Sequence, residues 1–234
     1  MPSLTARLYL AGALALAAAI AVVPASRAQA PASPSQAPAA GRDLKLRGDR
    51  FAPLTWDQLT PAQRTMVEHL LSGERGGLNG PFNVLLRSPE MGDLAQQFGA
   101  ATRFHSSLPK KLNELAIITT GRYFTSQYEF QAHHRAALEA GLSPAIADAV
   151  AQGKRPTGMS KEEATVFDFC WELLTTKQVS DANFKAAKDA FGERGVVDLI
   201  GVMGWYSTVS MALNVDRYPV PDGQKPELAP LKLP

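Results

Sequence analysis

The chain contains one cysteine, Cys170, and this scarcity excludes two kinds of chemistry. A single cysteine cannot form an internal disulfide, and it cannot supply the Cys-x-x-Cys pair of a dithiol redox protein. Cys170 stands within the apolar stretch 166–174. That position predicts a buried small hydrophobic side chain rather than a catalytic thiol.

The sequence also lacks a strong net charge and any strand-like pattern. Its 24 Lys and Arg residues are nearly balanced by 22 Asp and Glu residues, which leaves a formal charge of +2. This balance does not provide the basic surface that nucleic acid binding requires. No run alternates apolar and polar residues as a half-buried strand would, whereas helical spacing recurs throughout. The predicted fold class is therefore all-α.

The first 30 residues have the pattern of a secretory signal peptide. Arg7 is the only charge before an apolar run over 8–23, and Ala28-Gln29-Ala30 has the small-x-small form of a cleavage site. The alternative is an uncleaved anchor, for which the run is slightly shorter than the roughly 20 residues that span a bilayer. The pattern predicts a periplasmic or secreted protein.

Composition divides the rest of the chain into three parts. Residues 31–43 begin with a Pro-, Ala-, Ser- and Gln-rich stretch that cannot bury a core, and we predict a disordered linker there. Residues 44–220 are long enough for one domain with a sizeable core. Residues 221–234 are Pro-rich, which predicts a loose tail or a strap over a neighbouring subunit.

Start and stop signals predict a series of helices in the domain. Thr60-Pro61 with Gln63, and Ser160 with Glu163, are capping boxes. Together with the Gly and Ser-Pro boundaries they predict helices over 60–71, 88–98, 107–121, 126–140, 143–153, 160–176, from 180 onward, and 195–214. The last is the most apolar, but its polar groups are too many for a lipid-facing helix. It is predicted to be a buried central or interface helix.

Three groups that can transfer protons lie in the middle of this series. Glu129 and His133 are four residues apart, so they share one face of a helix. Glu114 lies in a segment that is apolar nearly all round, so its carboxylate must be paired or have a raised pKa. Such a trio is typical of acid/base catalysis, although a buried Glu–His pair can also simply tie two helices together.

Several motifs give the chain a resemblance to a known family. From residue 79 to residue 213 it resembles the carboxymuconolactone decarboxylase family. The motifs are Asn79-Gly-Pro-Phe82 with Arg87-Ser-Pro89, Leu108-Pro109 with Leu112-x-Glu114-Leu-Ala-Ile117, Tyr128-Glu129-x3-His133, Ala140-Gly-Leu-Ser143, Leu173-Leu-Thr-Thr176, and Phe191-Gly-Glu193. The resemblance covers most of the chain that follows the signal segment.

The same resemblance implies the fold of the alkylhydroperoxidase D-like thiol peroxidases. Their pattern of Glu, Cys-x-x-Cys and His falls here on Glu114, Ser126, Glu129 and His133. Both cysteine positions are therefore replaced. Thiol peroxidase chemistry needs one thiolate to attack the peroxide and a second thiol to resolve it, so the resemblance supports the fold and not this reaction.

The decarboxylase branch implies a cofactor-free enzyme acting on a small lactone or keto carboxylic acid, in a homo-oligomer that is a trimer or hexamer. It implies that Glu114, Glu129 and His133 are catalytic. We expect His133 to be the acid/base, Glu129 to orient its ring, and Glu114 to donate a proton to the substrate.

Five further residues are candidates for substrate binding. Arg122 can pair with a substrate carboxylate, or serve as a helix-end cation that partners Glu129. Ser126 is more typical of an N-cap than of a nucleophile, and Tyr128 is more typical of a core. His134 diverges from His133 and is expected to face solvent or a neighbouring subunit. Phe82 is expected to line the mouth of the site.

Two other functions stay open at this point. One is a helical oligomer that binds a small aromatic or lactone ligand without turnover, with Trp205, Tyr206 and Phe82 supplying an apolar pocket. The other is a metal site at Glu129, His133 and His134. The two histidines are adjacent and diverge on a helix, which disfavours a shared ion.

Overall fold

Helices alone build the part of the chain that can be described. In the computed structural model these are residues 42–221 and 223–231, which contain no strand and lie within one compact unit. The all-α prediction is confirmed. The predicted signal peptide, 1–30, and nearly all of the predicted linker, 31–43, lie outside the described residues. The elements are η1 Trp56–Gln58, α1 Pro61–Ser72, α2 Phe82–Leu85, α3 Pro89–Phe104, α4 Lys110–Tyr123, α5 Gln127–Glu139, α6 Pro144–Ala151, α7 Lys161–Thr176 and α8 Asp181–Asp216.

Most helices begin where their capping residues predict. The backbone N–H of Gln63 donates to the Thr60 hydroxyl, and the Thr60 N–H donates back to the Gln63 side chain at 2.9 Å. Ser160 and Glu163 form the same reciprocal pair at the start of α7. These boxes satisfy backbone donors that a helix start leaves unpaired. Helix α3 differs from prediction, because it continues through Gly99 to Phe104 instead of ending at Phe98.

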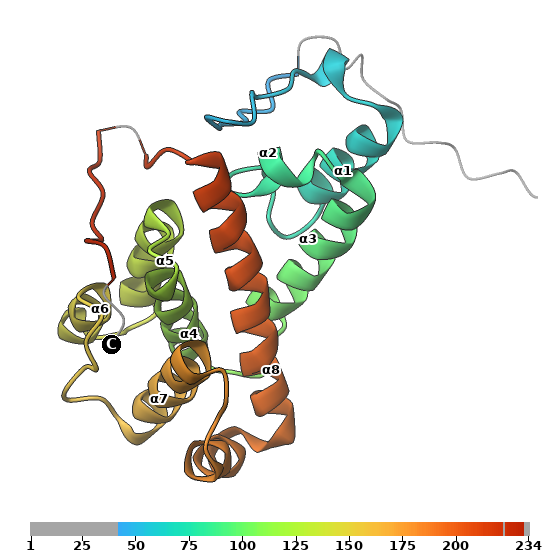
Figure 1. The fold of residues 1–234 in the computed structure, drawn as a ribbon. Coiled ribbons are helices and arrows are strands. Elements are labelled where there is room, and N and C mark those ends of the chain that lie inside the picture. The colour runs from blue at the N-terminus through green and yellow to red at the C-terminus, as the bar shows by residue number, and fades with distance from the viewer. Residues whose placement is uncertain (1–41, 222, 232–234) are drawn as a thin grey trace, which may run out of the picture. The chain divides into compact units, whose positions relative to one another are not determined.

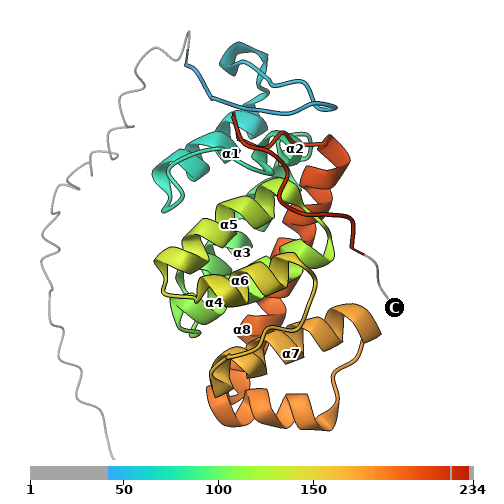
Figure 2. The same cartoon turned by 90° about the vertical axis from the view of Figure 1, so that its left-hand side faces the viewer.

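Helix α4 lies at the centre of the bundle and carries Glu114. Every residue from 112 to 122 is buried, and the helix packs against α5, α6, α7 and α8 (Figures 1 and 2). A Cβ added at Gly121 would lie 3.6 Å from the backbone nitrogen of Phe130, so α4 and α5 approach each other closely there. This close approach brings the Glu114 helix against the helix of Glu129 and His133.

Helix α8 consists of two helical parts that meet at Gly192, whereas the sequence predicted two separate helices, the second beginning at Gly195. Gly192 has φ 68° and ψ 178°, a conformation outside the helical region that glycine adopts without a Cβ penalty. Among the described residues, α8 alone is long and apolar enough to cross a membrane by length and composition, yet half of its most apolar window is buried inside the protein. It packs against α3, α4 and α7, which fits the predicted central helix (Figure 1).

The C-terminal segment differs from its prediction, because it is fixed to the chain's own α5. The Gln127 side-chain amide donates to the Leu228 carbonyl at 2.7 Å and accepts from the Leu228 N–H at 3.0 Å. Gln131 donates to the Lys225 carbonyl at 2.6 Å, and Leu228 is buried. The folded unit therefore extends past residue 220. The prolines that predicted a loose tail are compatible with an extended segment, and the backbone groups of this segment bond to glutamine side chains.

Candidate active site

The predicted trio comes together in one buried cluster. Glu114 lies on α4, and Glu129 and His133 lie one turn apart on α5. The Nδ1 of His133 forms a hydrogen bond with Glu114 Oε2 at 2.6 Å, and its Nε2 lies 3.1 Å from Glu129 Oε1. The three residues are only 4–5% exposed. The imidazole is thus held between two carboxylates that water barely reaches.

This environment favours the charged form of His133. Burial opposes an imidazolium, but the charge of Glu129 and the contacts of the two ring N–H groups with both carboxylates outweigh it and raise the pKa of His133 to about 9. At neutral pH the ring therefore carries both protons. Nδ1–H donates to Glu114. The Nε2 proton faces Glu129 Oε1 in an ion pair of 3.1 Å, although the two groups are poorly aligned for a hydrogen bond.

A cavity of about 450 Å³ opens beside His133 and Glu129. Of the residues predicted to bind substrate, Phe82 and Tyr128 line it, whereas Glu114 lies behind His133 and does not. Burial raises the pKa of Tyr128 to about 12, so its hydroxyl stays protonated. Other lining residues come from the loop after α1 and from α3, α5 and α8: Arg75, Asn79, Gly80, Pro81, Arg103, Ala132, Arg135, Ala136, Glu139, Trp205, Tyr206 and Val209.

Tyr206 adds a hydrogen-bond donor to this cavity. Its ring meets the His133 ring edge to face, with centroids 4.9 Å apart. Its hydroxyl is buried without a hydrogen-bond partner, and burial raises its pKa well above the usual value, so it keeps its proton. The sequence indicated Tyr206 only as an apolar pocket wall. Because Tyr206 stands among the apolar residues of the last helix, the sequence did not indicate a role for its hydroxyl.

Arg75 is a cation of the same cavity that sequence reasoning missed. It lies in the glycine-rich loop between α1 and α2, where nothing in the local pattern distinguishes it from a surface charge. Its guanidinium carbon lies 5.4 Å from the Phe82 ring centroid and 5.6 Å from that of Trp205. Its Nε and Nη2 are buried without hydrogen-bond partners. The only available signal was an arginine close to Asn79-Gly-Pro-Phe82.

Three predicted binding residues lie elsewhere. Arg122 and His134 line a separate cavity of about 680 Å³ beneath the C-terminal segment, where His134 Nδ1 lies 3.3 Å from Glu227 Oε2. The expected partnership of Arg122 with Glu129 is not formed, because its guanidinium donates to the Thr125 hydroxyl instead. Ser126 occupies the N-cap position of α5, but its buried hydroxyl makes no capping bond. His134 is half-buried against its own chain rather than facing solvent.

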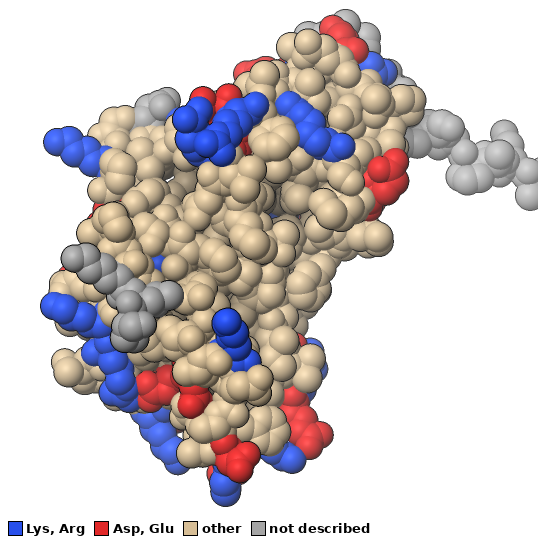
Figure 3. Space-filling model, in the orientation of Figure 1, with Lys and Arg blue, Asp and Glu red and all other residues tan. Residues whose placement is uncertain are grey.

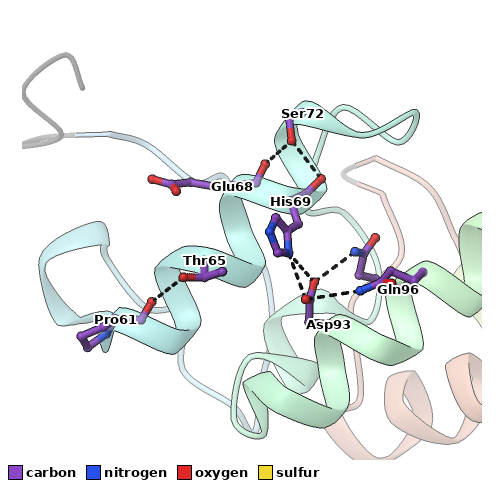
Figure 4. Close-up of polar contacts among 8 residues, drawn as sticks. Pro61, Thr65, Glu68, His69, Ser72, Asp93 and Gln96 are labelled. Carbon is purple, nitrogen blue, oxygen red and sulfur yellow. Dashed lines mark hydrogen bonds and ion pairs between the residues drawn. The ribbon is translucent and has the colours of Figure 1, made fainter. Parts of the chain in front are cut away.

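His69, His105 and Cys170 form no contact with Glu114, Glu129 or His133 among the bonds described. Figure 4 shows His69 on α1 facing Asp93 on α3, at 2.9 Å, with Gln96 bonded to the same carboxylate. His105 pairs with Glu74. Cys170 is fully buried, and burial raises its pKa far above the usual value. Within the described ranges, no group of three His, Cys, Asp or Glu side chains is arranged to hold a metal ion.

Comparison with known proteins agrees with this fold. The sequence model of the carboxymuconolactone decarboxylase family matches residues 89–169. A crystal structure of an AhpD-core, peroxidase-related protein from Ralstonia eutropha JMP134 is similar with a TM-score of 0.60 and 17% identity. The match covers 74% of this chain and 92% of that one. No curated protein matches the chain significantly.

A second solved structure gives the same result. A protein of unknown function from Agrobacterium tumefaciens, named for the antioxidant defence protein AhpD, has a TM-score of 0.54 and 13% identity. The match covers 61% of this chain and 99% of that one. At these identities the similarity demonstrates the fold alone. Residues 89–169, which include Glu114, Glu129 and His133, thus match the sequence model of the carboxymuconolactone decarboxylase family, and the chain has an AhpD-like helical fold.

Proposed function

We propose that the protein is a cofactor-free acid/base enzyme that acts on a small lactone or keto carboxylic acid, by decarboxylation or a related proton transfer. One observation carries the proposal: a protonated His133 lies between two buried carboxylates at the wall of a cavity of about 450 Å³. An imidazolium with a perturbed pKa, placed beside a ligand-sized space, is suited to donating a proton in catalysis.

The contacts suggest a division of roles that differs from the sequence-based expectation. Glu129 lines the cavity and lies 3.1 Å from His133 Nε2, so we assign it the role of base. Glu114 lies behind the ring and bonds Nδ1, so we assign it the role of holding the imidazolium in place. His133 is then the acid, because its Nε2–H lies beside Glu129 at the cavity wall.

In a decarboxylation, the bond between the carboxylate and the adjacent carbon breaks. Its electron pair moves into an enolate, and carbon dioxide leaves. The Nε2 proton of His133 then moves to carbon, and the ring recovers a proton from water. In an isomerisation, Glu129 removes a proton from carbon and His133 returns one at another position. Both schemes need a donor at the developing enolate oxygen, as Tyr206 can supply.

The test is a panel of lactone and keto carboxylic acids incubated with the protein in deuterated buffer. Carbon dioxide release and carbon–deuterium exchange are followed by NMR. The wild-type protein and the Cys170→Ser variant are expected to act equally, because the thiol lies in the core. The His133→Ala variant is expected to lose the activity, because the proton donor is absent.

Two outcomes would favour another function. Ligand-dependent melting shifts without product or exchange would favour the binding protein that the sequence left open. Thiol-driven peroxide reduction that persists in the Cys170→Ser protein would contradict the proposal. Peroxidase chemistry has no support from the residues, because the two positions of the thiol pair are Ser126 and Glu129.

We further propose that the protein forms a homo-oligomer through an apolar face of α3 and α8. Figure 3 shows this side of the molecule with few charges over its middle and more toward its ends. A large exposed apolar patch marks an interaction surface more often than the plain surface of a monomer. This face exposes seven large apolar side chains, each 47–69% accessible: Met91, Leu94, Phe98, Val197, Ile200, Met211 and Val215. The family resemblance implies trimers or hexamers.

Light scattering after size exclusion tests this assembly. The wild-type protein is expected to exceed the 25.1 kDa mass of one chain. The double variant Leu94→Glu and Ile200→Glu is expected to elute as a monomer, because two buried charges would oppose association. Phe184→Glu, a change at an exposed residue on the first half of α8, is the control. A monomeric wild type would contradict the assembly.

The apolar segment before residue 30 supports a proposal of export to the periplasm or the outside of the cell. The namesake reaction of the family belongs to intracellular aromatic catabolism. If the protein is exported, its natural substrate therefore differs from the namesake's.

A further inference from the structure

Arg75 has the environment of an anion-binding residue, but no side chain of the described residues supplies an anion that pairs with it. Its guanidinium is surrounded by the rings of Phe82, Phe104 and Trp205, each 5.4–5.8 Å from the guanidinium carbon. In the described part of the chain, no carboxylate lies within ion-pair distance of it. Burial lowers the pKa of Arg75, and the nearby charge of Glu129 offsets this cost only in part.

The ring contacts fix the direction of the guanidinium as well as its position. A Cβ added at Gly99 would lie 2.7 Å from Nη2 of Arg75, so α3 leaves room for the side chain only because a glycine stands there. The three ring contacts restrict a flexible side chain. A fixed planar fork with unpaired N–H groups is the arrangement that binds a carboxylate through two hydrogen bonds.

The other polar groups of the cavity complete the recognition of one kind of ligand. The Tyr206 hydroxyl is a second unpaired donor, and Glu129 Oε1 faces His133 Nε2 at the wall of the same cavity. Phe82, Trp205 and Val209 supply apolar walls. Arg103 also lines the cavity, but it is exposed and contributes a screened charge at the mouth.

We propose that Arg75 binds a carboxylate of the substrate and that the Tyr206 hydroxyl donates to a carbonyl oxygen of the same molecule, so that the ligand is a small keto or lactone carboxylate. This rests on the proposed function for the reaction that follows, but the binding itself does not require turnover. A cation stabilises a carboxylate more than it stabilises the transition state to neutral carbon dioxide. The carboxylate bound to Arg75 is therefore one that the reaction retains.

Calorimetric titration with a stable keto acid tests this assignment. The probe is 3-oxocyclopentane-1-carboxylate, and its neutral match is 3-oxocyclopentane-1-carboxamide. The wild-type protein is expected to bind the carboxylate more tightly than the amide. Arg75→Gln is expected to lower the affinity for the carboxylate about 10–100-fold and to leave the affinity for the amide unchanged, because only the charge pairing is lost.

Three variants sharpen the result. Arg75→Lys is expected to recover part of the affinity, because a lysine keeps the charge without the fork. Tyr206→Phe is expected to weaken both probes equally, since both carry the ketone. Arg155→Gln, which removes an exposed arginine paired with Asp168, is expected to bind as the wild type does. An equal loss of both probes in Arg75→Gln, or no preference of the wild type for the carboxylate, would overturn the assignment.

The same probe separates this inference from the proposed function. Its carbons beside the ketone exchange protons for deuterium when an enolising enzyme acts on them. Carboxylate-selective binding that depends on Arg75, without exchange in the wild type, would sustain the binding role and count against the proposed reaction. Exchange that depends on His133 but not on Arg75, with equal affinity for acid and amide, would do the reverse.

Discussion

Replacing Glu114 with glutamine is expected to lower turnover by about 10²–10⁴-fold and to shift the basic limit of activity to lower pH. The amide can still accept the hydrogen bond from His133 Nδ1, which is 2.6 Å from the carboxylate oxygen, so the ring keeps its orientation. It cannot supply the negative charge that helps to raise the pKa of His133 to about 9. The imidazolium therefore loses its proton at a lower pH in the variant.

Two measurements check this result. The rate on a compound that the wild-type protein transforms gives the loss of turnover, and NMR titration of the histidine ring gives the pKa of His133 without any substrate. Glu227→Gln is the matched control, because it neutralises a carboxylate 3.3 Å from His134, outside the cavity of the trio. Full turnover together with an unchanged titration of His133 would show that Glu114 is only a packing element.

The stability of the protein is expected to fall as the pH rises through 9. His133 has a pKa of about 9 in the folded protein and an ordinary value of 6.5, so the folded state holds its proton more tightly than the unfolded state. The stabilisation is fully present below pH 6.5 and is lost as the pH rises through the folded pKa. A shift of this size corresponds to about 3 kcal/mol of the free energy of unfolding.

Urea unfolding at intervals from pH 6 to pH 10 measures this loss. In His133→Gln the decrease over this range is expected to disappear, because the titrating group is gone. His69→Gln removes a histidine paired with Asp93 on the surface, and this variant is expected to keep the decrease. A wild-type curve that stays flat between pH 6 and pH 9 would contradict the charged state assigned to His133.

The sequence alone determined the helices and the trio. Capping boxes at Thr60 and Ser160 identify helix starts because they satisfy backbone donors locally. Glu129 and His133 are brought together by one helical turn. Glu114 stood out as a carboxylate in an apolar helix, which requires a partner, and the partner is His133. The resemblance to the carboxymuconolactone decarboxylase family named the fold.

The tertiary structure decided which groups share the cavity. Arg75 in the loop after α1 and Tyr206 on α8 are about 130 residues apart in the chain, and no local pattern relates them. The same packing places Arg122 in a different cavity and leaves Glu114 behind His133. It also binds the C-terminal segment to α5. Local rules describe a residue and its neighbours along a helix, whereas these contacts depend on how α3, α5 and α8 pack, which the sequence encodes only through the whole core.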